Sequence, residues 1–297
     1  MSRFFHVLLS ILSIAISLGI SEALYAASTY HPVAAVKGTS GALFLLTTEG
    51  TVLAVNLNLP AGQIVGSFKL AVAGAPTDMA YGIVGAKEML FIACNDAVGG
   101  KVLGKVYAFT TDGHLIGSWV IFNHTVAGLT YDAPNQTVYF TSGDSPEVYR
   151  ILSQPHAQPQ FVGEVIGSKR LGTVAVDSAH QQLYVSDVSQ GAVFSMRLNG
   201  PHVVAIVGYV GMPQALLMDM NTPRLMVADS AHGQIVSLSI AGHLGPPHPL
   251  TPRGTFKAPA GLAWEDPLRL IVSDQRAGSV TLLGPAGDVL YSLTLRY

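Results

Sequence analysis

Four side chains of this sequence have the chemistry of a ligand site, although they are widely separated along the chain. Asp144 and His232 could act as an acid or a base, and Arg170 and Arg276 could bind an anionic or hydroxylated ligand through charge-assisted hydrogen bonds. In an enzyme, Arg276 would stabilise developing negative charge. The same residues could equally form a solvated rim, so their role depends on whether the fold gathers them.

A second set of carboxylates recurs at matching points of the chain. Asp187, Asp229 and Asp274 each end a short β-rich run, LYVSD, LMVAD and LIVSD. A ring of carboxylates could bind a cation or a basic ligand, whereas a structural carboxylate would accept backbone N–H groups in its own turn. Their regular recurrence favours the structural role, and we expect function where the repeat is broken.

These runs belong to a repeat that covers most of the chain. The residues that open its six units, often within an apolar pair such as Gly261-Leu262, lie 44, 50, 45, 42 and 46 residues apart: Ala35, Met79, Leu129, Val174, Leu216 and Leu262. This period is typical of four-stranded propeller blades, which bury their faces only by stacking on neighbours. The sequence therefore predicts an all-β, six-bladed β-propeller of four-stranded antiparallel blades.

The strands within a unit follow from short β-rich runs and the turns between them. Second strands are predicted at 183–187, 225–229 and 270–274, third strands at 192–198, 234–240 and 279–283, and fourth strands at 115–121, 203–207 and 289–295. Asp112-Gly113 and Ala286-Gly287 suit the tight turns between third and fourth strands.

Departures from the repeat carry their own predictions. The prolines at 246, 247 and 249 leave the fifth unit a poor fourth strand. In the second unit, the extra residues 95–100 predict a longer projecting loop. The sixth unit has all four strands through Leu295, so we expect the ring to close by packing of the first blade on the last, without strand exchange.

Up-and-down strand order places the second-to-third-strand loops and the connections between blades on one face, around the channel mouth. Asp144, Arg170, His232 and Arg276 all fall in these segments, and His124, just before a first strand, is a further candidate. The sequence therefore predicts that the candidate ligand residues share one face of the disc.

Two segments resemble signatures of a known superfamily. LYVSD at 183–187 and PAGLAW at 259–264 are similar to motifs of six-bladed propellers in the NHL-repeat and gluconolactonase-like (SMP-30) superfamily. The likeness spans most of residues 30–297 and is strongest from 126 onward. It implies the fold, but the superfamily resembles scaffolds, receptors, lactonases and lyases alike, so it implies no single activity.

The resemblance also implies where an enzyme of this kind would hold a metal ion. Gluconolactonase-like enzymes are expected to bind a divalent cation, and peptide-amidating lyases zinc, through residues where the first strands begin. Here those positions carry no carboxylate and no imidazole, although such ions need several of these ligands; they are Val33, Thr77, Ala127, Gly172, Gln214 and Ala260. Asp78 lies one place further along. We therefore expect no metal and no cofactor.

The first 27 residues have the composition of an export signal. Arg3 precedes the apolar run 7–20, and small residues at 26–27 suit cleavage. We expect residues 1–27 to be removed and residues 28–297 to form one exported propeller domain, periplasmic or extracellular. A membrane would be a partner only through an uncleaved signal segment. With 11% charged residues and a net charge of -2, the chain has no basic face for nucleic acid.

These observations favour a non-catalytic binding or scaffold propeller that presents its channel face to a protein or small-molecule ligand. The alternative is a lactonase-like hydrolase or lyase acting at the channel mouth, with Asp144 or His232 as acid or base and Arg276 as anion stabiliser. A third possibility is a structural surface protein, because 49% hydrophobic residues and few charges permit self-association.

Overall fold

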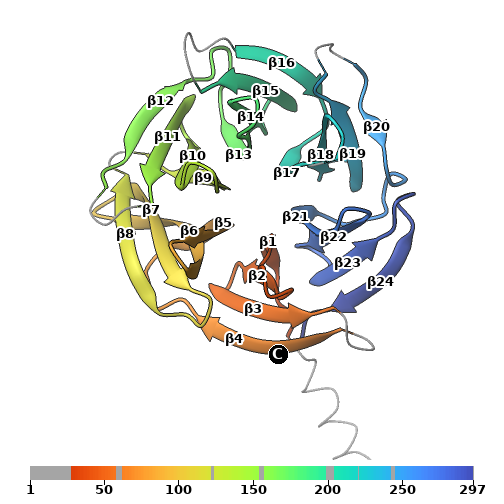
Figure 1. Cartoon of the computed structure of the whole chain (residues 1–297), viewed down its shortest axis with the longest axis horizontal. Coiled ribbons are helices and arrows are strands. Elements are labelled where there is room, and N and C mark those ends of the chain that lie inside the picture. The colour runs from red at the N-terminus through yellow and green to blue at the C-terminus, as the bar shows by residue number, and fades with distance from the viewer. Residues whose placement is uncertain are drawn as a thin grey trace, which may run out of the picture. The chain divides into compact units, whose positions relative to one another are not determined.

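The computed structural model describes residues 28–57, 62–121, 124–153, 157–198, 204–219, 221–241 and 245–296; the predicted signal at 1–27 lies outside them. From Tyr30 to Leu295, the described residues form six four-stranded antiparallel sheets arranged as blades around a central axis (Figure 1). This confirms the predicted six-bladed propeller. No helix in the described ranges is both long and apolar enough to pass through a membrane.

Each blade runs outward from its first strand at the axis to its fourth strand at the rim (Figure 1). Blades 1 to 3 contain β1 (Pro32–Lys37), β2 (Leu43–Thr47), β3 (Thr51–Asn56), β4 (Gln63–Lys69); β5 (Ala75–Val84), β6 (Lys87–Val98), β7 (Lys101–Thr110), β8 (Leu115–Ile121); and β9 (Val126–Asp132), β10 (Thr137–Ser142), β11 (Glu147–Leu152), β12 (Gln160–Glu164). Blades 4 to 6 contain β13 (Leu171–Asp177), β14 (Gln182–Asp187), β15 (Ala192–Arg197), β16 (Val204–Tyr209); β17 (Pro213–Met218), β18 (Arg224–Asp229), β19 (Gln234–Ser239), β20 (His248–Pro249); and β21 (Pro259–Asp266), β22 (Arg269–Asp274), β23 (Ser279–Leu283), β24 (Val289–Thr294).

The predicted strands agree with the observed ones to within one or two residues. Strands β14, β18 and β22 end at the repeated aspartates, and β15, β19 and β23 begin where the third strands were expected. The turn glycines Gly113 and Gly287 have φ values of 95° and 79°, which other residues rarely adopt. Strand β20 is reduced to His248–Pro249, because proline has no N–H to donate to a ladder.

The prediction of a projecting loop in the second unit is wrong. Residues 95–98 continue β6 instead, and the β6–β7 ladder extends as far as the pair Val98 and Lys101. The turn consists of Gly99 and Gly100, with φ values of 59° and 78°. Two residues with positive φ allow a tight turn that matches strand twist, so the extra sequence lengthens the hairpin rather than forming a loop.

The ring closes by packing, as predicted. Strands β1–β4 and β21–β24 form separate sheets, and a buried apolar cluster joins them, including Leu45 and Leu53 from blade 1 and Ile271 and Val280 from blade 6. The Tyr30 backbone N–H donates to the Leu295 carbonyl at 3.1 Å. Thr29 and Arg296 form one isolated antiparallel bridge of their own.

Glycine at the start of several inner strands has a steric cause. A Cβ added to Gly128 on β9 would lie 2.4 Å from the Cα of Thr173 on β13. A Cβ on Gly261 of β21 would lie 2.6 Å from the backbone nitrogen of Ala35 on β1. First strands of neighbouring blades therefore approach each other at backbone distance around the axis, and the Gly-Leu pairs of the repeat permit this.

Candidate functional site

The first strands enclose a central channel that contains two adjoining cavities. The mouth cavity, about 410 Å³, opens on the face that carries the loops between the second and third strands of the blades. Its lining includes Asn95, Gly143 and Arg170. The rear cavity, about 310 Å³, is lined by residues that include Lys37 and Trp264. Asp78, Thr173 and Ala260 line both cavities, so the two meet at these residues.

Asp78 is the one carboxylate among the described residues that line the mouth and rear cavities. Its Oδ1 accepts the Met79 backbone N–H and its Oδ2 accepts the Leu129 backbone N–H from β9, each at 2.8 Å. Solvent reaches it only in part, through the channel. Burial raises its pKa to about 7, against the lowering effect of the two N–H groups. A carboxyl group that titrates near neutral pH inside a cavity is a mark of a functional site.

Sequence reasoning noted Asp78 but did not select it, because the register of the inner strands is irregular. A shift between Pro76 and Asp78 interrupts the pairing of β5 with β6. A similar shift follows the first residue of β1, β13, β17 and β21. Simple alternation therefore does not tell which residue of a first strand faces the channel.

The two predicted arginines lie at the channel mouth. Arg170, just before β13, lines the mouth cavity, and Arg276, just after β22, lines a side cavity of about 430 Å³. Both are exposed, and no carboxylate among the described residues forms an ion pair with either. Gln214 and Gln275 line both the mouth cavity and the side cavity. Residues with hydrogen-bond donors therefore lie at the entrance on the side of blades 4 to 6.

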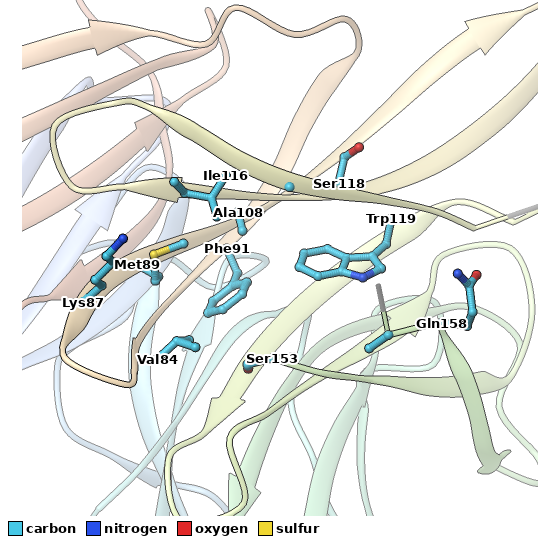
Figure 2. A pocket seen from close by; sticks show the side chains of 12 residues that line it. Val84, Lys87, Met89, Phe91, Ala108, Ile116, Ser118, Trp119, Ser153 and Gln158 are labelled. Carbon is cyan, nitrogen blue, oxygen red and sulfur yellow. The ribbon is translucent and has the colours of Figure 1, made fainter. Parts of the chain in front are cut away.

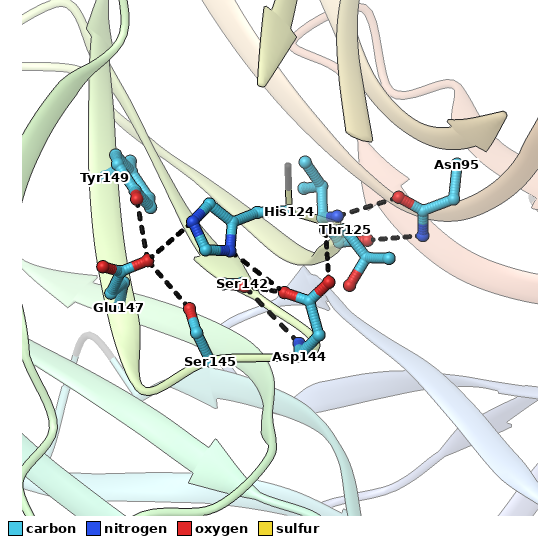
Figure 3. Close-up of polar contacts among 9 residues, drawn as sticks. Asn95, His124, Thr125, Ser142, Asp144, Ser145, Glu147 and Tyr149 are labelled. Atoms are coloured by element: carbon cyan, nitrogen blue, oxygen red, sulfur yellow. Dashed lines mark hydrogen bonds and ion pairs between the residues drawn. The ribbon is translucent and has the colours of Figure 1, made fainter. Parts of the chain in front are cut away.

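Asp144 lies on the same face but belongs to a polar cluster in blade 3 (Figure 3). Its Oδ2 accepts the Thr125 backbone N–H at 3.1 Å, and its Oδ1 accepts the Ser142 hydroxyl at 2.6 Å. His124 Nδ1 lies 3.3 Å from the same Oδ1. Burial alone would raise the pKa of Asp144, but these hydrogen bonds outweigh it and lower the pKa.

Sequence reasoning missed Glu147, the second carboxylate beside His124. Its Oε2 lies 3.1 Å from His124 Nε2 and also accepts the Tyr149 and Ser145 hydroxyls at 2.8 and 2.9 Å (Figure 3). Both imidazole nitrogens of His124 thus lie close to carboxylate oxygens. His124, Asp144 and Glu147 line neither the mouth cavity nor the side cavity. Their contacts instead join the segment just before β9 to the β10–β11 turn.

His232 is held in its own turn. Its Nδ1 lies 2.6 Å from Asp229 Oδ2, and the Asp229 carboxylate also accepts the Met212 backbone N–H at 3.0 Å. His232 lines neither the mouth nor the side cavity. The fold therefore brings Arg170 and Arg276 to the entrance but leaves Asp144 and His232 in separate polar contacts.

The repeated aspartates have the structural role that their recurrence favoured. Asp187 accepts the backbone N–H groups of Lys169 and Ser189, at 2.7 and 2.8 Å, and Asp274 accepts those of Lys257 and Ala277, at 2.6 and 2.9 Å. Each carboxylate thus ties the connection before its blade to its own turn. Burial would raise the pKa of Asp187, but its many donors lower it well below the usual range.

The largest cavity described lies away from the channel. A groove of about 580 Å³ between the β8 side of blade 2 and blade 3 is lined mainly by apolar side chains, including Met89, Phe91 and Trp119, with Lys87 near one end (Figure 2). It contains none of the candidate residues. Ligand sites need a few polar groups that converge to fix orientation, and the channel mouth has these.

No set of three or more His, Cys, Asp or Glu side chains within the described residues is arranged to hold a metal ion. The side chains of the channel offer two kinds of polar group. A carboxyl group that titrates near neutral pH lies within it, and guanidinium and amide donors lie at its entrance.

Comparison with known proteins shows the fold. No family model and no curated protein matches the sequence. A chain of a nidogen/laminin complex is similar in structure, with a TM-score of 0.66 and 13% identity over 84% of this chain and 93% of that one. A catalytically inactive virginiamycin B lyase from Staphylococcus aureus, solved with quinupristin, gives 0.62 and 13% over 88% and 83%. A streptogramin B lyase gives 0.62 and 9% over 91% and 84%.

These neighbours include both a protein from a binding complex and enzymes, so the shared architecture does not select an activity. The chain is by fold a six-bladed β-propeller with structural neighbours of the virginiamycin B lyase type.

Proposed function

We propose that this protein is an exported, non-catalytic binding or scaffold propeller that presents its channel face to a partner rich in carboxylates or carbonyl groups. The observation that carries the proposal is the entrance, where Arg170 and Arg276 lack carboxylate partners among the described residues and where Gln214 and Gln275 line both the mouth cavity and the side cavity. Guanidinium groups favour bidentate bonds to carboxylates. In this proposal, Asp144 and His232 are polar residues at the rim of the same face.

The two arginines provide a direct test with an acetylated, amidated hexaglutamate peptide as the probe. We expect the double substitution Arg170→Gln and Arg276→Gln to weaken binding measured by calorimetry at low salt by about 10-fold or more, since two charge-assisted contacts are lost. Arg197→Gln is the matched control, because Arg197 is exposed at the end of β15, near the turns of the opposite face. Equal losses in both variants, or no binding to wild type, would contradict the proposal.

A second candidate function is a lyase or hydrolase that acts in the channel. The observation in its favour is Asp78, whose pKa of about 7 suits an acid or base. Asp144 and His232 are less suited, because both are hydrogen-bonded outside the cavities. Incubation with quinupristin, followed by mass spectrometry, tests it: conversion by wild type that Asp78→Asn abolishes would favour the enzyme, and an unchanged substrate would count against this activity.

Export and domain organisation form part of the same proposal. The apolar composition of residues 7–20 and the small residues at 26–27 support a cleaved signal, which would leave residues 28–297 as one propeller domain. Mass spectrometry of the protein purified after expression with its native N-terminus would find a chain that begins near residue 28 if this is right, and a full-length chain if it is not.

A further inference from the structure

The mouth cavity has opposite charges at different depths. Arg170 lies at the exposed rim, and Asp78 lies on the inner strand β5, where the mouth cavity meets the rear cavity. Among the described residues that line the mouth cavity, these are the only two with charged side chains. The rest of its lining is apolar or neutral, including Thr77, Asn95 and Gln214. A ligand in this cavity therefore meets a cation first and an anion further in.

Asp78 can still accept hydrogen bonds from a ligand. Each of its oxygens accepts one backbone N–H, and an ionised carboxylate oxygen has room for more than one donor. Lys37, the one lysine or arginine among the described residues that line the rear cavity, is paired with Glu265. Tyr81 and Tyr131 also line that cavity, and burial raises the pKa of both, so neither supplies charge at neutral pH. A ligand cation would satisfy Asp78 best.

We propose that the mouth cavity binds a small zwitterion, with its ammonium group at Asp78 and its carboxylate at Arg170. The volume of about 410 Å³ lies within the range of small-molecule sites and suits an amino acid derivative or a short peptide. This inference rests on the proposed function, because it names the ligand class of the same channel face. The inference assigns a ligand contact to the Asp78 carboxylate inside the channel, whereas the proposed function uses only the donors at the rim.

The test uses three pairs of probes that differ only in the amino group: glycine and acetate, 4-aminobutanoate and butanoate, and 6-aminohexanoate and hexanoate. We expect the best zwitterion to bind wild-type protein at least about tenfold tighter than its partner without the amino group, as measured by calorimetry at pH 8. The preference should shrink from pH 8 to pH 6, because protonation of Asp78 removes the charge that attracts the ammonium. A preference below threefold for every pair would overturn the inference.

Two substitutions assign the contacts. Asp78→Asn should abolish the preference for the amino group, and Arg170→Gln should weaken the zwitterion and its partner to the same extent, because both carry the carboxylate. Asp266→Asn, on a carboxylate paired with Arg269 outside the channel lining, is the control and should change neither. A preference that persists in Asp78→Asn would overturn the inference. If that variant does not fold, the change in the wild-type preference between pH 8 and pH 6 decides whether Asp78 contacts the ammonium group.

Failure of this inference is distinguishable from failure of the proposed function. If hexaglutamate binds through Arg170 and Arg276 while no zwitterion gains from its amino group, the channel face is a binding surface and the inference alone is overturned. If neither hexaglutamate nor any of the six small probes binds, both are overturned.

Discussion

Replacing Gly261 with alanine should lower the free energy of unfolding by about 3 kcal/mol, the upper part of the range for overpacked cores. The added Cβ would lie 2.6 Å from the backbone nitrogen of Ala35 and 2.9 Å from the carbonyl carbon of Ala34. These are backbone atoms of β1, so no side-chain rotation relieves the contact. Blade 6 and blade 1 would have to move apart. Urea unfolding followed by circular dichroism would measure the change.

Gly117→Ala is the matched control for this prediction. Gly117 lies on β8, and a Cβ there would meet nothing within 4 Å. We expect a change within about 0.5 kcal/mol, as is usual for surface substitutions. A similar loss in both variants would show that the close approach of the inner strands does not limit stability.

Asp78→Asn should remove a pH dependence of stability that the wild type shows between about pH 4 and pH 7. The pKa of Asp78 is raised from 3.8 to about 7 in the folded protein. Within this window the folded state keeps a proton that the unfolded state releases, so wild-type stability falls as the pH rises. Below the window both states are protonated, and above it both are ionised, so the loss is complete above pH 7.

The size of this effect follows from the shift. About three pH units at 1.36 kcal/mol per unit give an upper bound of about 4 kcal/mol, and the partial solvent exposure of Asp78 reduces our expectation to about 2 kcal/mol. The stability of Asp78→Asn relative to wild type should therefore improve by about 2 kcal/mol from pH 4 to pH 8. Asparagine can accept only one of the two backbone N–H groups, which costs stability equally at all pH values and leaves the slope unaffected.

Urea titrations of both proteins at unit pH intervals would measure how the free energy of unfolding changes with pH. Asp266→Asn is the control, because hydrogen bonds from Leu268 and Arg269 lower the pKa of Asp266 and it titrates below this window. Its pH profile should follow that of the wild type from pH 5 to pH 8. If Asp78→Asn also follows the wild type, Asp78 titrates as an ordinary exposed carboxylate, and its importance in the channel is lost.

The sequence-based account was most successful for local pattern and least successful for the channel lining. Strand ends at Asp187, Asp229 and Asp274 were predicted, because a β-rich run followed by a turn former is a local signal. The loop at 95–100 was mispredicted, since the number of residues between strands does not reveal whether their ladder continues. Glu147 was missed because its partner His124 approaches from another segment of the blade.

The chain by itself determined its six sheets, their strand order and the face on which Arg170 and Arg276 lie, because period, alternation and turn residues are all encoded over short distances. Only the tertiary structure decided which inner-strand residues face the axis. A register shift at Pro76 and Asp78, together with the meeting of first strands from different blades, places a partly buried carboxylate in the channel. Burial of that kind depends on neighbours distant in sequence, and burial is what raises the pKa of Asp78.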